Sequence, residues 1–386
     1  MKKKIRVIAS PDSFKGSICA ADAAYAIKKG MESVNSEDVM FEVLALPVAD
    51  GGEGTLDALR EQYEIRSASV TGPDGKKIIA EYGVSADTAL IEMASAAGLT
   101  LIPPETRSAA RTTTYGVGEL IRRAYADGCR KITLTVGGSA TNDCGCGMFS
   151  ALGTVFYDKN DVSFVPTGAT LGDIARVDTC GARDILDECE FTLATDVTNL
   201  LFGDEGATAV YAPQKNATED ELRVMERGMR HAAELFVLSG GQNVADVAGA
   251  GAGGGVGAPL LAFGRAKVLS GIEAVLSALD FDKKLDGCDL VITGEGRLDR
   301  QSLYGKAVGG VAAAARKRGV PVAVVAGSVA EDVRALMGAD IFLIVALSDF
   351  EPDTEKSMKN AADLLERAGE KIAEGLSGKD TNLPIS

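Results

Sequence analysis

The chain contains a single histidine, His231, and this scarcity limits the chemistry open to it. His231 falls in a helical pattern that follows a capping box formed by Thr218 and Glu221. A Ser-His-Asp or Cys-His nucleophile system is therefore not expected, and a carboxylate is the expected general base. The closely spaced Cys144 and Cys146 lack the two-residue gap of the usual zinc motif, so no zinc site is predicted.

Basic charge is also in short supply. The chain has 40 Lys and Arg residues against 55 Asp and Glu residues, which gives a formal charge of −15. The basic run Lys2 to Lys4 is only three residues long and precedes the first expected strand. A surface this acidic repels a phosphate backbone, so nucleic acid is not an expected partner.

No uncharged apolar run reaches the roughly 18 residues that a membrane-spanning helix needs, so no membrane association is predicted. Pro11 and Asp12 interrupt the first apolar segment, which excludes a signal peptide. The seven cysteines are odd in number and scattered, a pattern typical of reduced thiols in the cytoplasm. The expected partners are small molecules, and the protein is expected to be a monomer or a homodimer.

The composition indicates an Ala- and Gly-rich α/β enzyme. Hydrophobic residues make up 46% of the chain, which also has 45 glycines and only 5% aromatic residues. A length of 386 residues is too great for one ordinary core, so two domains are expected.

Polar loops follow five strand-like runs, and the third of these loops along the chain is the most informative. The apolar run Ile132 to Val136 leads into G-G-S-A-T-N-D, residues 137–143, whose side chains suit hydroxyl or phosphate oxygens. The other loops are P-D-S-F-K-G-S after Val7 to Ala9, A-D-G-G-E-G-T after Val43 to Val48, T-D-V-T-N after Phe191 to Ala194, and G-E-G-R-L-D-R-Q-S after Leu290 to Thr293. Ligands of α/β proteins bind at the carboxyl ends of strands, so five such loops predict a cleft.

The first two loops leave alternatives open. A helix capped by Ser17 would place Lys15 beside a helix N-terminus, where an anion is favoured; a solvated lysine is the alternative. The loop does not meet the Walker A pattern. Asp50 and Glu53 are separated by two glycines and can approach a metal or a hydroxylated ligand closely, or they form a glycine-rich turn with a capping acid. Thr55 is expected to cap the helix that follows.

Three later features are candidates for a catalytic or ligand-binding role. Asp196, at the end of the run F-T-L-A-T-D, is the best candidate for a catalytic carboxylate. Arg297 can pair with a substrate carboxylate in fork geometry or form a salt bridge to Asp299. The glycine run 249–257 does not follow a convincing strand and so fails the context of a Rossmann fingerprint; a tight turn between helices and a phosphate cradle both remain open.

The periodicity changes between Ile65 and Leu99. Alternating runs at 65–70, 78–84 and 89–93 predict antiparallel strands, which begin a second domain inserted into the first. After Asp289 the α/β rhythm returns, with strands at 320–327 and 341–347, a helix near Val333 and a last helix over 355–374. The predicted domains are residues 1–64 plus 286–386, and residues 65–285.

Six motifs in this order, over most of the chain, resemble the bacterial glycerate kinase family that phosphorylates D-glycerate with ATP. They are P-D-S-F-K-G-S, A-D-G-G-E-G-T, T-T-Y-G-V-G-E-L-I, G-G-S-A-T-N-D, L-A-T-D-V-T-N and T-G-E-G-R-L-D-R-Q-S. The resemblance implies a parallel-sheet, Rossmann- or flavodoxin-like domain into which a mixed-sheet α/β domain is inserted, with the active site in the cleft between them. It also implies ATP, a divalent metal such as Mg²⁺, and 2-phosphoglycerate as the usual product.

Phosphoryl transfer needs positive charge on the phosphates, a metal held by carboxylates and an oriented acceptor hydroxyl. Our hypothesis is that Asp196 orients or deprotonates the glycerate hydroxyl, while Lys15 and Arg297 hold anionic oxygens. The metal is expected on Asp50, Glu53 and Asp196. The predicted substrate- and phosphate-binding residues are Asp12, Ser13, Ser17, Gly51, Gly52, Gly137, Gly138, Ser139, Thr141, Asn142, Glu295 and Asp299.

Three other readings stay open. The first is a kinase for a related small hydroxy acid. The second is a non-catalytic sensor of small acids, which would need no metal-binding carboxylates. The third, a nucleotide-dependent dehydrogenase, predicts a G-x-G-x-x-G turn after the first strand, and P-D-S-F-K-G-S is not one.

Overall fold

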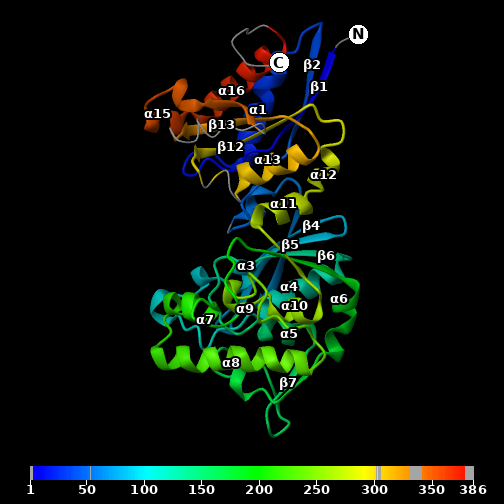
Figure 1. Cartoon of the computed structure of the whole chain (residues 1–386), viewed down its shortest axis with the longest axis vertical. Coiled ribbons are helices and arrows are strands. Elements are labelled where there is room, and N and C mark those ends of the chain that lie inside the picture. The colour runs from blue at the N-terminus through cyan, green and yellow to red at the C-terminus, as the bar shows by residue number, and fades with distance from the viewer. Residues whose placement is uncertain (1–2, 53, 301, 303–305, 331–340, 379–386) are drawn as a thin grey trace. The chain divides into compact units, whose positions relative to one another are not determined.

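The computed structural model describes residues 3–52, 54–300, 302, 306–330 and 341–378 of the chain. These residues form two compact units (Figure 1). Unit 1 contains residues 1–50, 57–61 and 275–386, and unit 2 contains residues 51–56 and 62–274. The domain boundaries drawn from the sequence stay a prediction. The predicted helix near Val333 lies outside the described residues.

Unit 1 is built on a five-stranded sheet in which every neighbouring pair is parallel. From edge to edge its strands are β14 (Ile341–Ala346), β13 (Val322–Val329), β12 (Leu290–Leu298), β1 (Lys3–Ala9) and β2 (Val39–Ala45). Numbered by their place in the chain, the strands run 2-1-3-4-5 across the sheet. The order reverses between β1 and β12, and such a switch point is where doubly wound sheets bind ligands.

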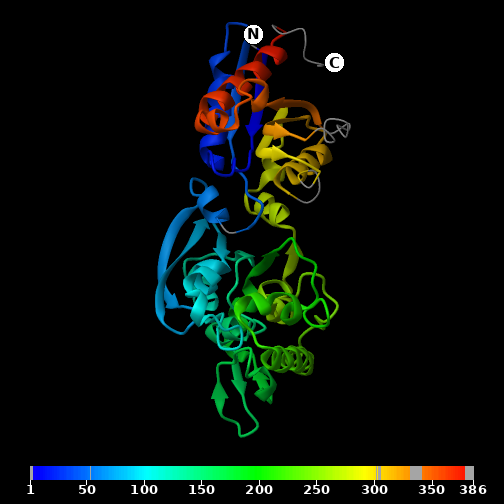
Figure 2. The same cartoon turned by 90° about the vertical axis from the view of Figure 1, so that its left-hand side faces the viewer.

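The helices of unit 1 are α1 (Ala20–Ser33), α12 (Phe281–Lys284), α13 (Ala307–Lys317), α15 (Thr354–Lys359) and α16 (Ala361–Leu376), with the 3₁₀ turn η7 (Leu347–Asp349). Helices α1 and α16 lie side by side, as both views show (Figures 1 and 2). Glycines permit this close approach, because a Cβ on Gly30 would overlap the backbone of Glu366, and a Cβ on Gly369 would overlap that of Ile27.

Unit 2 contains a six-stranded mixed sheet. Its strands are, in order, β11 (Lys267–Leu269), β10 (Glu190–Ala194), β6 (Lys131–Thr135), β5 (Thr88–Glu92), β4 (Lys77–Ser85) and β3 (Glu64–Thr71). Strands β3, β4 and β5 pair antiparallel, as the alternating pattern predicts, and β5, β6, β10 and β11 pair parallel. A small antiparallel sheet adds β8 (Ser163–Phe164), β7 (Val155–Tyr157) and β9 (Arg176–Asp178).

The helices of unit 2 bury its apolar core against the mixed sheet. They are α3 (Met93–Ala97), α4 (Tyr115–Ala126), α5 (Cys146–Leu152), α6 (Arg183–Glu188), α7 (Ala207–Tyr211), α8 (Glu219–Leu238), α9 (Ala252–Gly255) and α10 (Ala258–Phe263), with 3₁₀ turns at Leu99–Leu101, Pro104–Thr106, Leu171–Asp173, Cys180–Ala182 and Pro213–Lys215. Short helices α2 (Thr55–Ala58) and α11 (Gly271–Ala278) lie where the chain passes between units. The predicted capping box of α8 is confirmed, since Thr218 and Glu221 bond reciprocally.

The α/β class, with one parallel and one mixed sheet, is confirmed. Two local predictions are wrong. Helix α1 begins at Ala20, and its N-cap is Cys19 rather than Ser17, because a tight turn closes the chain first. The last helix is divided into α15 and α16. All seven cysteines are free, and no helix among the described residues has the length and apolarity to cross a bilayer.

Candidate active site

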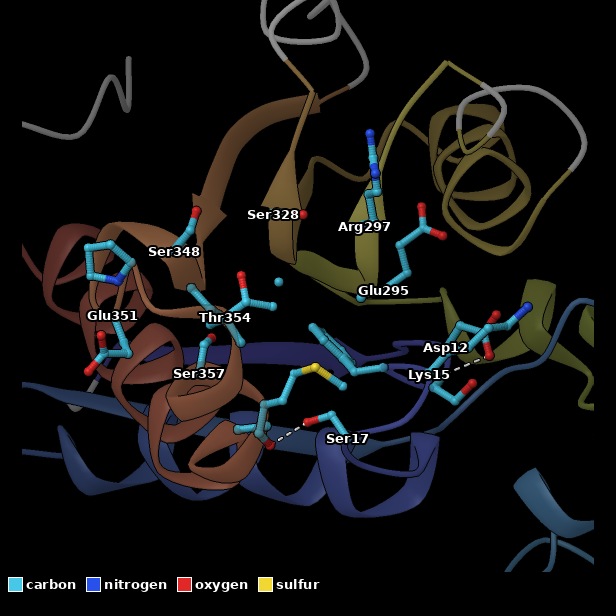
Figure 3. A pocket seen from close by; sticks show the side chains of 18 of the residues that line it. Asp12, Lys15, Ser17, Glu295, Arg297, Ser328, Ser348, Glu351, Thr354 and Ser357 are labelled. Carbon is cyan, nitrogen blue, oxygen red and sulfur yellow. Dashed lines mark hydrogen bonds between the residues drawn. The ribbon is translucent and has the colours of Figure 1, made fainter.

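Unit 1 has a pocket of about 380 Å³ at the carboxyl ends of its strands. The loop after β1 supplies Asp12 and Lys15, the end of β12 supplies Glu295 and Arg297, and η7 and α15 close the other side (Figure 3). Asp12 N donates to Gly294 O at 2.8 Å, which ties the first loop to β12. The pocket thus opens beside the switch point of the sheet.

Two carboxylates occupy one end of this pocket. Burial, opposed by a hydrogen bond from Ser13 N and aided by the charge of Asp50, raises the pKa of Asp12 above its ordinary value. Burial, opposed by a hydrogen bond with Ser302 and aided by the charges of Asp12 and Asp299, also raises the pKa of Glu295. Glu295 Oε1 is buried without a hydrogen-bond partner. Two desolvated acids and an orphaned oxygen favour a cation at this end.

Three cationic side chains, those of Lys15, Arg297 and Lys306, line the same pocket. None of them forms an ion pair within the described part of the chain. Arg297 therefore does not form the salt bridge to Asp299 that the sequence left open; Asp299 accepts from Ser302 N at 3.2 Å instead. Because β12 extends to Leu298, Arg297 lies on the strand itself and not in a loop.

Lys15 lies in a turn and not at a helix terminus. Phe14 N donates to Ile18 O at 3.0 Å, and Ile18 N donates to Phe14 O at 3.1 Å, so residues 14–18 form a closed loop. The Phe14 ring is buried beneath the turn, whereas Lys15 is exposed at its tip. This anchor fixes where the Lys15 side chain leaves the backbone at the edge of the pocket that it lines.

The opposite end of the pocket is less charged. Thr354 and Ser357 of α15 face it (Figure 3), and Pro352 and Met358 also line the pocket. Ser17 Oγ donates to Met358 O at 2.6 Å, which links α15 to the first loop. The pocket therefore combines an ionic end with an end of hydroxyl and apolar groups that also holds the carboxylate of Glu351, which suits a ligand that has a charged head and a weakly polar body.

The G-G-S-A-T-N-D loop of unit 2 is held from inside by Asp143, which is fully buried. Its carboxylate accepts from Thr114 N at 2.7 Å, Thr114 Oγ1 at 2.9 Å, Gly145 N at 3.2 Å and Gly147 N at 3.3 Å. Burial raises the pKa of Asp143, while these hydrogen bonds oppose that shift. Asp143 therefore organises the loop and does not face a ligand.

Thr141 and Asn142 are buried as well. Asn142 Nδ2 donates to Thr208 Oγ1 at 3.0 Å, while Asn142 Oδ1 and Thr141 Oγ1 have no partner. The glycine run 249–257 packs behind them. A Cβ on Gly254 would lie only 2.0 Å from Thr141 O, so only glycine lets the run pass this close to the loop. The run is therefore a tight structural turn in unit 2.

Lys215 is the charged residue that sequence reasoning missed in unit 2. Its side chain is only 1% exposed, and its ammonium donates to Ser139 Oγ and to Thr141 O, both at 2.7 Å. Burial, opposed by the charge of Asp143, lowers the pKa of Lys215 to about 7. Nothing in the local pattern A-P-Q-K-N marks this lysine as buried, because its surroundings come from distant segments.

The remaining predicted residues lie as follows. Asp196 is exposed and its Oδ1 accepts from Gly271 N, the first residue of α11, at 2.8 Å. Gly51 is buried, and a Cβ there would lie 2.2 Å from Gly271 Cα. Gly52 O accepts from Thr55 Oγ1 at 2.7 Å. Glu53 lies outside the described residues.

The predicted metal ligand Asp50 lines the unit 1 pocket with Asp12 and Glu295. Within the described ranges, no three His, Cys, Asp or Glu side chains cluster as a ready-made metal site. Mg²⁺ does not need one, since it is commonly bound through one or two carboxylates together with substrate phosphates and water. The orphaned Glu295 oxygen fits that role.

Comparisons with known proteins give a consistent picture. The model of the "Glycerate kinase family" matches residues 7–377. Glycerate 2-kinase of Escherichia coli K12 is 40% identical over 377 residues, which are 97% of this chain and 98% of that protein. Glycerate kinase of Bacillus subtilis 168 is 41% identical over 373 residues, with 96% and 97% covered.

A crystal structure assigned to glycerate kinase 2 of Salmonella typhimurium LT2 is similar over the whole fold. It has a TM-score of 0.84 and 37% sequence identity, and the match covers 97% of this chain and 99% of that one. The fold and these relatives define a kinase, an enzyme that transfers a phosphoryl group. The chain belongs to the glycerate kinase family, as the resemblance of its motifs predicts.

Proposed function

We propose that the protein transfers the γ-phosphoryl group of ATP to D-glycerate and forms 2-phosphoglycerate. Membership of the glycerate kinase family supports the acceptor. The observation that supports ATP as the phosphoryl donor is the unit 1 pocket at the switch point of a parallel sheet. There, three cationic side chains without ion pairs in the described chain line the same pocket as two desolvated carboxylates. A polyanion accompanied by a metal ion satisfies both sets of charges.

Unit 1 is a flavodoxin-like variant of the Rossmann fold in this proposal, because its strand order is 2-1-3-4-5. Lys15, Arg297 and Lys306 bind the phosphate oxygens. The end lined by Pro352, Thr354 and Met358 receives the nucleoside, whose base is apolar on its faces and polar at its edges. Ser13, Ser17 and Asp299 shape the loops around the nucleoside end and the charged end of the pocket.

Mg²⁺ would be held by Glu295 with Asp12 or Asp50, since these carboxylates share the pocket and repel one another without a cation. When bound, the ion neutralises charge on the phosphates and orients them for in-line transfer. This assignment differs in part from the metal ligands predicted from the sequence. Asp50 remains a candidate metal ligand, and Glu295, which the sequence analysis assigned to substrate binding, becomes one.

Asp196 accepts or orients the proton of the glycerate hydroxyl. Thr135 of β6 lies opposite Ala194 of β10, so the loops after these parallel strands leave the sheet side by side. Asp196 and residues 137–139 therefore lie on loops that leave neighbouring strands, and the Asp196 carboxylate accepts from Gly271 N at 2.8 Å. A ligand whose carboxylate lies on residues 137–139 would present the hydroxyl one carbon away, on C2, to Asp196. This arrangement favours the 2-phosphate.

The test is ADP release by the purified protein with Mg-ATP, with and without D-glycerate, followed by phosphorus NMR of the product. Glycerate-dependent release is expected, with a phosphorus doublet from the single C2 proton; a triplet would indicate the 3-phosphate. No glycerate-dependent ADP release would contradict the proposal, and turnover with another hydroxy acid alone would change the proposed substrate.

The seven free cysteines support a reducing, cytoplasmic setting for the protein.

A further inference from the structure

Residues 137–139 of unit 2 carry backbone donors that the fold leaves unused. Within the described residues, no acceptor takes the N–H groups of Gly137, Gly138 and Ser139. Ser139 pairs with Gly98 in an antiparallel bridge whose hydrogen bonds are made by the flanking residues, Ala140 N to Ala97 O and Leu99 N to Gly138 O. In such a pair the N–H of Ser139 points away from its partner.

These donors are accessible and firmly placed. Gly137 and Gly138 are exposed, and Gly138 has a φ of 71°, which favours glycine. The same short segment is tied to residues 97–99 by hydrogen bonds on one side, and the residues that flank it, Val136 and Thr141, pack closely against the glycine run. Successive N–H groups form an anion-binding concavity where the backbone turns through a left-handed residue, and Gly138 is such a residue.

Lys215 adds a buried cation directly behind this segment. Its ammonium donates to Ser139 Oγ at 2.7 Å, so a lone pair of that hydroxyl is occupied and its own proton is left to be donated. The charge also draws electron density from Ser139 and makes the hydroxyl a stronger donor. A lysine that is 1% exposed pays a large desolvation penalty, which an anion beside Ser139 would offset.

We propose that Gly137, Gly138 and the Ser139 hydroxyl bind the carboxylate of the hydroxy-acid substrate, and that Lys215 is a positioning residue that acts through Ser139. A single cation behind neutral donors matches the single charge of a carboxylate better than the several charges of a nucleotide. This inference rests on the proposed function for the identity of the acid.

Gly137→Ala tests the carboxylate site without disturbing the fold. A Cβ at Gly137 meets no atom within 4 Å, and its φ lies outside the left-handed region, so the variant should fold normally. The methyl group would occupy the space that the carboxylate needs. We expect the KM for D-glycerate to rise about tenfold or more, with the KM for ATP unchanged. Gly172→Ala is the matched control, because Gly172 is also exposed with no neighbour within 4 Å.

Lys215→Met tests the positioning role, since Met keeps the apolar stem and removes the charge. We expect the KM for D-glycerate to rise about 10- to 100-fold, the range of a charge-assisted hydrogen bond. The same substitution in a Ser139→Ala background should have a much smaller effect, because Lys215 acts through that hydroxyl. Thr112→Val is the control for simple loosening of the loop, since Thr112 Oγ1 donates to Ala140 O at 2.9 Å and does not contact Ser139.

Calorimetric titration of D-glycerate into the same full-length proteins separates this proposal from the proposed function. If the wild type binds D-glycerate but transfers no phosphate, the proposed function fails while weaker binding by Gly137→Ala still supports the carboxylate site. The site is overturned if Gly137→Ala and Lys215→Met both bind D-glycerate within twofold of the wild type. It is equally overturned if the KM for ATP rises instead, because the bound anion would then be a phosphate.

Discussion

In the pocket of unit 1 the ionic side chains face open space, whereas the charged groups of the unit 2 loop are sealed inside. Lys15 and Arg297 have no ion pair among the described residues, and Asp12 and Glu295 share a site that raises the pKa of both. In unit 2, Asp143 accepts four hydrogen bonds and Lys215 donates two. The first arrangement is incomplete without ligands of both signs. In the second arrangement the charged groups are hydrogen-bonded within the protein, and it presents neutral donors to a ligand.

The largest expected effect comes from Glu295→Gln, which leaves the shape of the pocket and removes its orphaned charge. We expect kcat to fall about 100- to 1000-fold, the range seen when one electrostatic stabiliser of a transition state is lost. Stability should change in the other direction. The folded-state pKa of Glu295 is raised, so ionising it costs free energy in the folded protein, and this cost grows as pH rises above the ordinary carboxyl range.

The neutral variant should therefore unfold at the same or a higher temperature at pH 7. Thermal unfolding and ADP release on the same samples check both halves of this prediction. A variant that loses activity and stability together would show that Glu295 has a structural role. The unit 1 pocket would then not differ from the unit 2 loop in leaving its charged groups for ligands.

Mg²⁺ should distinguish the units in a second way. With EDTA in excess we expect ATP-dependent turnover to disappear, and with Mg²⁺ and ATP present we expect the unfolding temperature of the wild type to rise through mass action. Glu295→Gln should show a smaller rise. Gly137→Ala should show the wild-type rise, and a reduced one there would argue against a nucleotide site confined to unit 1.

Asp143→Asn tests whether the buried charge of unit 2 is structural. Asparagine offers one acceptor oxygen where the carboxylate offers two, so at least one buried donor loses its partner. We expect a loss of about 1–3 kcal/mol in the free energy of unfolding, measured by urea denaturation. Asp173→Asn is the control, because Asp173 is exposed in the same unit. An unchanged stability for Asp143→Asn would contradict the organising role of this residue.

A smaller effect is expected from Lys15→Met, which removes one exposed cation from the unit 1 pocket. The KM for ATP should rise about tenfold, equivalent to about 1.4 kcal/mol, without a change in unfolding temperature. Lys29→Met provides the control, since Lys29 is an exposed lysine of α1 paired with Glu366 and does not line the pocket. Equal ATP affinity in the wild type and Lys15→Met would remove Lys15 from the phosphate site.

The most gradual effect concerns pH. The pKa of Lys215 is lowered to about 7 in the folded protein, so between pH 7 and the ordinary lysine range the unfolded chain binds more protons than the folded one. Stability of the wild type should therefore rise with pH in that window relative to Lys215→Met, by less than about 1.4 kcal/mol per pH unit. Urea denaturation of both proteins at pH 6, 7, 8 and 9 measures this difference. A constant difference would show that Lys215 keeps its proton throughout.

The sequence predicts features that depend on local order. The runs at 7–9 and 191–194 form strands that end in the predicted loops, because period and turn chemistry depend on neighbouring residues. The run at 290–293 is also a strand, but β12 continues to Leu298 through residues predicted to form a loop. The antiparallel start of unit 2 is predicted for the same reason.

Features that depend on tertiary packing are not predicted. Ser17 has the chemistry of an N-cap, yet the Phe14–Ile18 turn displaces the helix start to Ala20. Lys215 reads as an ordinary surface lysine, and only distant segments bury it behind Ser139. Thr354 and Ser357 join the pocket because α15 folds back over the first loop from more than 300 positions away, a contact that no local pattern encodes.

The most direct test of the account is a crossed measurement of KM for ATP and for D-glycerate in the wild type, Lys15→Met and Gly137→Ala. The account predicts that Lys15→Met raises only the KM for ATP and that Gly137→Ala raises only the KM for D-glycerate. A variant that raises both constants equally, or the reverse assignment of the two substrates, would contradict the division of binding between a charged pocket in unit 1 and a backbone anion site in unit 2.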